Sequence, residues 1–311
     1  QLKGGDVQTF YAFKGIVRRR HPERDEWYDK LLKEVSKKKP LKKKKLKGDT
    51  AYIFTLSDWQ LGKDDLGVEK TLERYDKALE RAVEEIRSLG TIDEIYLLSM
   101  GDLTEGCYGF YDSQPHNISL NLSQQYHLAR KLIMKTVDTF LPYANKITLS
   151  GVPANHGEMS RSGKGKVVTS RLDNSDTMHL EICEEIMNQN PRYDKVIVSI
   201  PQGFHHTLDI KGLTVGFTHG HMHSGGTGPE GKIIKWWQGQ MFGDFPVGDA
   251  EILITGHFHH PRMMQQGNRT WFQCPSIDAS IDFTARTGMW SKPGVLTFTI
   301  DKNGWDNYKL V

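Results

Sequence analysis

Five short polar clusters in the sequence carry side chains that can bind metal ions. Each cluster contains an Asp, Asn or His, and each follows a run of apolar residues. Two divalent cations about 3.5 to 4 Å apart compensate phosphoryl charge and supply hydroxide at neutral pH, but they need a bridging carboxylate with oxygen and imidazole ligands. A lone Asp or His at a strand end is more often a cap or turn residue, so the prediction depends on the five together. The clusters are 57–60, 101–102, 155–158, 218–221 and 256–259.

Strands and helices alternate in the first half of the sequence, and the strands deliver the first three clusters. Apolar residues at helical spacing predict two helices, which end at Gly90 and Pro142. Short apolar runs between them predict strands. This is the order of a βαβ array, in which functional residues gather at the carboxyl ends of the strands. The helices are expected at 69–89 and 122–140, and the strands at 52–56, 95–99 and 147–149.

After about residue 200 the pattern changes to short strands without intervening helices, which predicts a second, mixed sheet. The last polar cluster contains His257 and His259, which are separated by one residue. Alternate side chains of an extended segment point the same way, so both imidazoles can face one metal pair. The strands are expected at 206–210, 213–217, 252–255, 270–272 and 295–300.

The order of the clusters resembles the calcineurin-like metallophosphoesterase superfamily, whose pattern is Asp-x-His, Gly-Asp, Gly-Asn-His-Asp/Glu, His, then Gly-His-x-His. The resemblance spans roughly residues 52–298 and implies an α/β fold, a four-layer α/β/β/α sandwich of two mixed sheets flanked by helices. It also implies two sets of metal ligands that share Asp102 as the bridge. The first ligand set is Asp58, Gln60, Asp102 and His259, and the second ligand set is Asp102, Asn155, His219 and His257.

The resemblance further implies that His156 is catalytic without being a ligand. In the family this histidine contacts the scissile phosphate and protonates the leaving oxygen, which is general acid catalysis. Glu158 is expected to orient His156, and His221 is expected to orient a neighbouring ligand. Four other histidines, His116, His127, His205 and His206, are interpreted as structural, whereas His223 is a possible extra ligand that the family pattern does not need.

Two positions depart from the family pattern. Gln60 stands where the family usually has His, and Ala154 replaces the Gly before Asn155, with Gly157 moving the acid on to Glu158. A Gln carbonyl oxygen is a neutral, hard ligand, which weakens the first site and favours manganese over softer metals. The expected cofactors are two divalent cations, Mn²⁺ first, with Mg²⁺, Fe²⁺ and Zn²⁺ as alternatives.

A narrower resemblance is to phage-encoded relatives of the SbcD-type double-strand-break repair nucleases. It is carried by the segments 57–63, 236–240, 246–249 and 255–260. It implies manganese-dependent exonuclease and endonuclease action on DNA, in phage repair, recombination or processing within the host cytoplasm. Such nucleases often have His three residues after the bridging Asp, where this chain has Glu105. A homodimer and an ATPase partner remain open.

Charge is distributed unevenly along the chain. Residues 1–48 hold 16 Lys/Arg against 6 Asp/Glu, and the remainder holds 25 against 32. We therefore divide the chain into a basic N-terminal arm with a Lys-rich linker (1–48) and a catalytic domain (49–311), with a basic amphipathic helix within 10–35. A basic arm on an acidic body suggests a polyanionic partner such as DNA, although a solvated tail is the simpler alternative.

The paired tryptophans and several basic residues each have two interpretations. Trp236 and Trp237 either stack on nucleobases or pack in the core or a lid. The basic residues after Asn155 and in the linker either grip backbone phosphates or are merely solvated. The candidate nucleic-acid contacts are Arg161, Lys164, Lys166, Lys42, Lys43, Lys44 and Lys45.

The leading functional hypothesis is a metal-dependent DNA nuclease. One alternative is a phosphodiesterase or phosphatase acting on nucleotides or phosphoproteins, because the same metal core serves all these substrates. Another is a non-catalytic nucleic-acid-binding protein whose metal site has degenerated around Gln60. The sequence has no apolar run near the roughly 20 residues that span a bilayer and no secretion signal, and its three cysteines are far apart, so a cytoplasmic protein without membrane association is expected.

Overall fold

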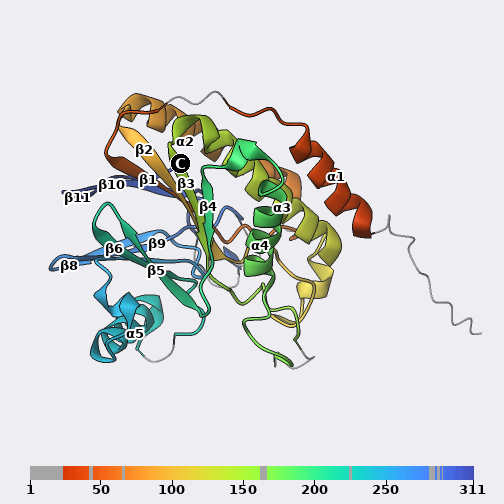
Figure 1. Cartoon of the computed structure of the whole chain (residues 1–311). Helices are drawn as coiled ribbons and strands as arrows, with labels where there is room; N and C mark the ends of the chain where they lie inside the picture. The colour runs from red at the N-terminus through yellow and green to blue at the C-terminus, as the bar shows by residue number, and fades with distance from the viewer. Residues whose placement is uncertain are drawn as a thin grey trace, which may run out of the picture.

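The computed structural model describes residues 24–41, 45–64, 67–161, 167–223, 226–279, 284–285, 288 and 290–311. Its first sheet has six strands in the order β11-β10-β1-β2-β3-β4 (Figure 1). β1 to β4 run parallel, and β10 and β11 add an antiparallel edge. The strands are β1 (Thr50–Ser57), β2 (Ile92–Gly101), β3 (Lys146–Gly151), β4 (Val196–Ser199), β10 (Leu296–Asp301) and β11 (Gly304–Leu310).

Helices cover the outer face of this sheet, and alternate residues of the strands separate the two faces. In β1, Tyr52 and Phe54 belong to the core shared with the helices, whereas Ala51 and Ile53 belong to the core shared with the second sheet. This is the period of two expected of a strand buried on both sides. The helices are α1 (Arg24–Ser36), α2 (Val68–Leu89), α3 (Leu122–Phe140) and α4 (Ser175–Met187).

The second sheet has five strands in the order β5-β6-β7-β9-β8 and lies against the first (Figure 1). One further helix, α5 (Gly228–Phe242), packs on its outer face through Ile233 and Trp237. The molecule is therefore a four-layer α/β/β/α sandwich, and the predicted fold class is confirmed. The strands are β5 (His205–Ile210), β6 (Leu213–Thr218), β7 (Ile252–Thr255), β8 (Arg262–Gln266) and β9 (Arg269–Gln273).

The prediction of strands without intervening helices after about residue 200 was wrong, because α5 connects β6 to β7. Its sequence carries a weak helical signal: Gly231 and Gly239 lie inside it, and Ile233 and Trp237 are its only fully buried positions among the described residues. A stripe this narrow does not produce a clear 3.6-residue period. Two parallel strands of one sheet nevertheless need a crossover, which a helix commonly supplies.

Part of the segment assigned to the basic arm packs on the body. Leu31 and Val35 of α1 are buried in the helix-side core, and the ring of Trp27 lies 4.5 Å from that of His127 on α3. Asn190 donates hydrogen bonds to the backbone oxygens of Val35 and Lys38. Described residues from 27 onward thus pack on the helix-side core, while residues 1–23 lie outside the described part of the chain. None of the helices among the described residues is long and apolar enough to cross a membrane.

Candidate metal centre

The predicted ligands lie in loops at the carboxyl ends of β1, β2, β3, β6 and β7, and many of them have strained backbones. Among the described residues, eight non-glycine residues have a positive φ, and five of these are predicted ligands. A left-handed backbone conformation costs a non-glycine residue of order 1–3 kcal/mol, and residues in this conformation cluster at functional sites. The strain aims side chains from several loops at one place. The five are Asp58 (50°), Gln60 (43°), Asp102 (54°), His257 (71°) and His259 (58°).

The second ligand set is assembled around Asp102. Ligand atoms of Asp102, His219 and His257 all lie within 4.8 Å of one another. Nε2 of His219 lies 3.1 Å from Oδ2 of Asp102 and 3.0 Å from Oδ1 of Asn155. Nδ1 of His219 donates to the backbone oxygen of Met100 at 2.7 Å, which fixes the ring and leaves Nε2 to face the cluster. Carboxylate, amide oxygen and imidazole groups therefore converge as a divalent cation requires, with Asp102 and His219 fully buried.

Charges inside the second ligand set are balanced by one another. Burial alone would raise the pKa of Asp102, but the charges of His219 and His156 outweigh it and lower this pKa. Burial would lower the pKa of His219, but Asp102 outweighs it and raises that pKa to about 9. Burial lowers the pKa of His257 to about 3, so this imidazole is neutral at pH 7. A cation at this set would compete with a proton for Nε2 of His219.

The first ligand set is only partly assembled. Nε2 of His259 lies 3.3 Å from Oδ1 of Asp58, and the backbone N–H of His257 points at both oxygens of the same carboxylate at 3.2 Å. Burial would raise the pKa of Asp58, but the hydrogen bond and charge of His259 outweigh it and lower it. Gly256 allows this approach, because a Cβ there would lie 2.8 Å from Oδ2 of Asp58. Gln60 is engaged as well, since its Oε1 accepts a hydrogen bond from Nζ of Lys63 at 3.2 Å.

His156 is held against the carboxylate of Asp102 and is not one of the predicted ligands. Its backbone N–H donates to Oδ1 of Asp102 at 2.8 Å. Its Nδ1 donates to the backbone oxygen of Glu105 at 2.7 Å, and the Glu105 carboxylate lies 3.7 Å from the same atom. Its Nε2 is thereby the ring nitrogen left for a substrate. Glu105, noted from the sequence only as a departure from the repair nucleases, thus lies where it can orient the ring.

The prediction that Glu158 orients His156 was wrong. The buried Glu158 carboxylate pairs with Arg161 at 2.6 Å and with Arg171 at 2.7 Å. Arg161 in turn donates to the backbone oxygen of Gly109 and lies over the ring of Phe110. Gly157 separates the acid from His156, and the carboxylate instead meets two arginines that follow it by three and thirteen residues in the chain.

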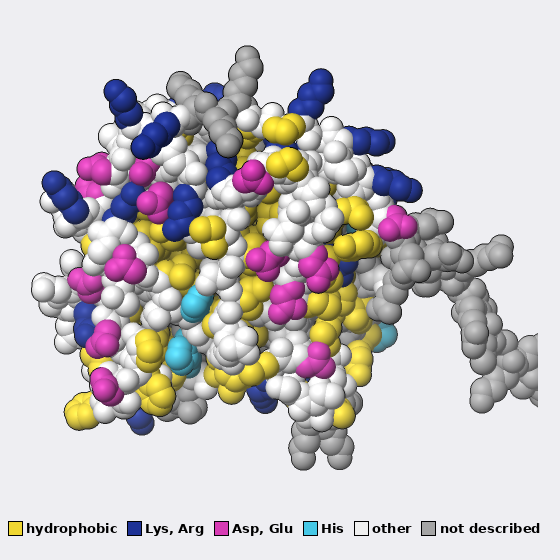
Figure 2. Space-filling view, viewed as in Figure 1, with side chains coloured by type: hydrophobic (Ala, Val, Ile, Leu, Met, Phe, Trp, Pro, Cys, Tyr) yellow, Lys and Arg dark blue, Asp and Glu magenta, His cyan; other side chains and the backbone are white. Residues whose placement is uncertain are grey.

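The candidate nucleic-acid contacts fall in different surroundings. Arg161 is committed to Glu158, and Lys45 is exposed. Lys42, Lys43, Lys44, Lys164 and Lys166 lie outside the described residues. On the face shown in Figure 2, the described Lys and Arg side chains lie mainly toward the top and left, with Asp and Glu among them.

Two histidines near the centre and the paired tryptophans have distinct roles. The ring of His221 lies 5.3 Å from that of His219, and neither of its nitrogens has a hydrogen-bond partner among the described residues. His223 is buried, and its ring stacks on that of Trp236 with the centroids 4.0 Å apart. Trp237 is buried under the second sheet and donates to the backbone oxygen of Val247. The packing interpretation therefore holds for Trp237.

Sequence reasoning missed several residues that support the centre. Asp176, in the first turn of α4, accepts hydrogen bonds from the backbone N–H groups of Asp102 and Leu103 at 3.2 and 3.0 Å. An acidic residue after the cap Asn174 marks the start of a helix, but nothing in the sequence connects this residue to the loop that carries Asp102. Lys63 pairs with Asp278 at 2.9 Å, across 215 residues of chain. Contacts between such distant positions have no local signal.

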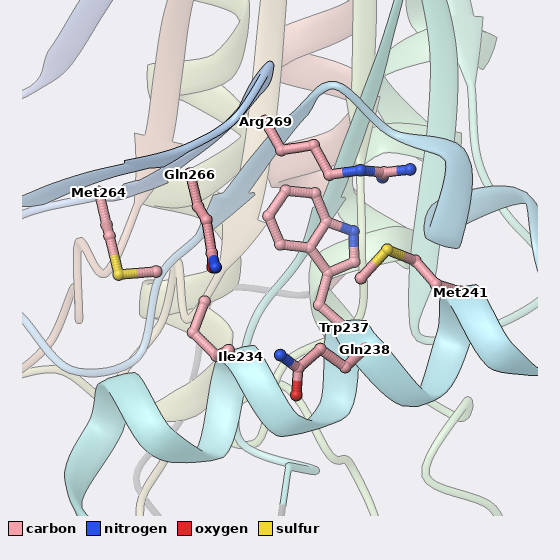
Figure 3. Close-up of a pocket in the computed structure, with 7 residues that line it drawn as sticks. All are labelled: Ile234, Trp237, Gln238, Met241, Met264, Gln266 and Arg269. Carbon is pink, nitrogen blue, oxygen red and sulfur yellow. The ribbon is translucent and has the colours of Figure 1, made fainter.

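A separate pocket lies between α5 and the β8–β9 hairpin (Figure 3). Its volume is about 190 Å³, and the ring of Trp237 forms its floor, with Arg269 beside it. None of its lining residues is a predicted ligand. They are Ile234, Trp237, Gln238, Met241, Met264, Gln266 and Arg269.

No protein-family model matches the chain, and no curated protein matches it. Several solved structures align with it. An archaeal phosphodiesterase is 11% identical, with 84% of this chain and 99% of the other covered and a TM-score of 0.37. Vps29 from Entamoeba histolytica, complexed with Zn²⁺, is 13% identical, with 82% and 88% covered and a TM-score of 0.39. A predicted phosphoesterase from Streptococcus pneumoniae is 11% identical, with 55% and 76% covered and a TM-score of 0.30. At these values the alignments identify neither family nor reaction, so the chemistry has to be read from the side chains of the centre.

Proposed function

We propose that this chain is a metal-dependent phosphoesterase that hydrolyses phosphodiester bonds in DNA. One observation carries the proposal. The predicted ligand atoms of Asp102, His219 and His257 lie within 4.8 Å of one another, and the backbone N–H of His156 donates a hydrogen bond to the Asp102 carboxylate. Carboxylate and imidazole ligands together suit a catalytic divalent cation. A histidine beside the ligands, but not among them, suits proton transfer to the leaving group.

Each residue has a distinct part in this reaction. Asp102 and the imidazoles of His219 and His257 would hold a divalent cation, which would offset charge on the phosphoryl oxygens and activate water. The Asp102 carboxylate also accepts a hydrogen bond from the backbone N–H of His156 and so fixes its position. Because Nδ1 of His156 donates to Glu105, Nε2 is the atom that would pass a proton to the leaving oxygen. The Glu105 carboxylate, 3.7 Å from Nδ1, would help to keep the ring in this orientation. Mn²⁺ is the proposed cation, since Asn155 contributes an oxygen to the nitrogen ligands.

DNA is the proposed substrate because of the lysine run. Lys42 to Lys45 are consecutive, and Lys45 is exposed. Lysines that neutralise phosphates release counterions, which gives affinity without sequence preference. Arg161 and Arg171 add little to this in their present state, because Glu158 pairs with both. That pairing favours a second candidate, a phosphodiesterase acting on smaller phosphodiesters that need no extended basic surface.

Cleavage assays separate the two candidates. Wild-type protein and a variant with Lys42 to Lys45 all replaced by Gln would be tested with Mn²⁺ on end-labelled DNA and on a small aryl phosphodiester. A variant with the four lysines replaced by Arg is the matched control. The proposal predicts that the Gln variant has a higher KM for DNA and unchanged cleavage of the aryl ester. The slope of log DNA affinity against log salt concentration should also fall by about one unit for each lysine that contacts a phosphate. Equal effects on both substrates, or cleavage of the aryl ester alone, would favour the small-substrate candidate.

A further inference from the structure

A lysine–aspartate ion pair adjoins the first ligand set. Nζ of Lys63 lies 3.2 Å from Oε1 of Gln60 and 2.9 Å from Oδ2 of Asp278. The side chains of Lys63 and Asp278 are only 12% and 6% exposed. Both groups act electrostatically on His259, the imidazole of the same ligand set. The ammonium of Lys63 therefore lies beside the first-metal position, paired with its counter-ion Asp278.

The backbone around this pair is held firmly. The hydroxyl of Ser276 donates to the backbone oxygen of Asp58 at 2.8 Å and accepts from the backbone N–H of Asp278 at 2.9 Å. The backbone N–H of Lys63 donates to the backbone oxygen of Gln60 at 3.2 Å. These bonds place both members of the pair at a fixed distance from the ligand loop. Removing the ammonium would require the lysine to leave a largely buried position.

The ammonium already lies at the oxygen that a metal ion would use. Oε1 is the only atom of Gln60 that can coordinate a hard cation, and it already accepts from Lys63. A divalent cation on this oxygen would lie within a few ångströms of the ammonium, in a poorly solvated site where like charges repel strongly. The second ligand set has no such neighbour among its described hydrogen-bond and ion-pair partners, and its atoms already converge.

We infer that Lys63 supplies the positive charge at the first-metal position, so that the chain binds one divalent cation tightly, at the second ligand set. The inference rests on the metal centre of the proposed function, but it changes the number of metal ions from two to one. It also gives Asp278 a role, which is to hold the ammonium at Gln60.

Manganese titration tests the inference without measuring catalysis. Metal-free protein would be titrated with Mn²⁺, with free Mn²⁺ measured by electron paramagnetic resonance and bound Mn²⁺ by elemental analysis after gel filtration. Wild type is expected to retain one ion per chain, with the spectrum of an isolated Mn²⁺. Lys63→Met should bind a second ion at least about tenfold more tightly than wild type does, with spin coupling between the two. Lys63→Arg, which retains the charge, should behave as wild type, and melting curves would check that each variant is folded.

The outcomes distinguish the inference from the proposed function. Two coupled ions in wild type would overturn the inference and leave a metal-dependent esterase intact. A single ion in folded Lys63→Met would also overturn it, because the ammonium would then not be what excludes the second ion. No tightly bound ion in wild type would contradict both the inference and the metal centre.

Discussion

The rings of His156 and Phe110 are stacked, with centroids 4.1 Å apart and planes inclined by 10°. The guanidinium of Arg161 lies 4.0 Å from the centroid of the same Phe110 ring. One ring thus connects the proposed acid to a buried ion-pair group, and Phe110 touches no predicted ligand in the described contacts. Phe110 is therefore a positioning residue for His156.

Replacing Phe110 by Leu should lower kcat for phosphodiester cleavage roughly tenfold, because a small misplacement of a catalytic group has a large effect on rate. KM and manganese affinity should change little, since the ligands stay in place. The measurement is a kcat and KM comparison over a range of pH. Phe110→Tyr keeps the aromatic ring and should restore most of the rate.

Tyr108→Phe is the matched control for this effect. It removes a hydroxyl that donates to the backbone oxygen of Arg161, in the same loop, and it leaves the stacked rings of His156 and Phe110 unchanged. A kcat loss in Tyr108→Phe as large as that in Phe110→Leu would show that the loop matters and that the stack does not.

Replacing Glu158 by Gln should destabilise the fold by about 3 kcal/mol, because it leaves two arginines beside a buried position without their common counter-ion. Denaturant titration at pH 7 measures the change. Asp76→Asn is the comparison, since it breaks the exposed pair with Lys135 and should cost no more than about 0.5 kcal/mol. Similar costs for the two variants would contradict the assignment of Glu158 as a buried structural anchor.

His179 should make the fold sensitive to acid. Burial, followed by the charge of Arg130, lowers the pKa of His179 to about 3. Its unfolded pKa is about 6.5, so the unfolded state binds the proton first and stability falls as pH drops from about 6.5 toward 3. His179→Leu should reduce this slope by up to about 1.4 kcal/mol per pH unit, as measured by denaturant titration between pH 7.5 and 4.5.

The control for His179 is Cys183→Ala, which removes another buried side chain of α4. Burial raises the pKa of Cys183 to about 12, so this thiol does not titrate in the tested range. Its stability change should be the same at every pH. A parallel pH-independent shift in His179→Leu would contradict the titration account.

The sequence predicted what depends on local pattern. The ends of β1 and β2 and the residues Asp58 and Asp102 followed from apolar runs and from the order of the motifs, and both sheets were expected. The surroundings of those residues were not predictable in the same way. Spacing placed Glu158 near His156, but the carboxylate partner of a side chain depends on rotamers and on distant segments such as the one that carries Arg171.

Contacts between distant segments also explain the other differences. Asp278 reaches Lys63 only because β9 leads back to the loop after β1, and no periodicity encodes that approach. The helix α5 was missed because its buried stripe is narrow. In each case the information lies in the packing of separate elements rather than in a window of neighbouring residues.

Cleavage of end-labelled DNA by wild type and by Asp102→Asn, with Mn²⁺, with Mg²⁺ and with a chelator, tests the central claim most directly. Asp102→Asn removes the charge shared by the ligands and by His156 while keeping the side-chain shape. The account predicts Mn²⁺-dependent cleavage that the chelator stops and that the substitution lowers by at least about a thousandfold, together with loss of tight Mn²⁺ binding. Cleavage that persists in the chelator, or in a folded Asp102→Asn protein, would contradict a metal-dependent phosphoesterase built on this carboxylate.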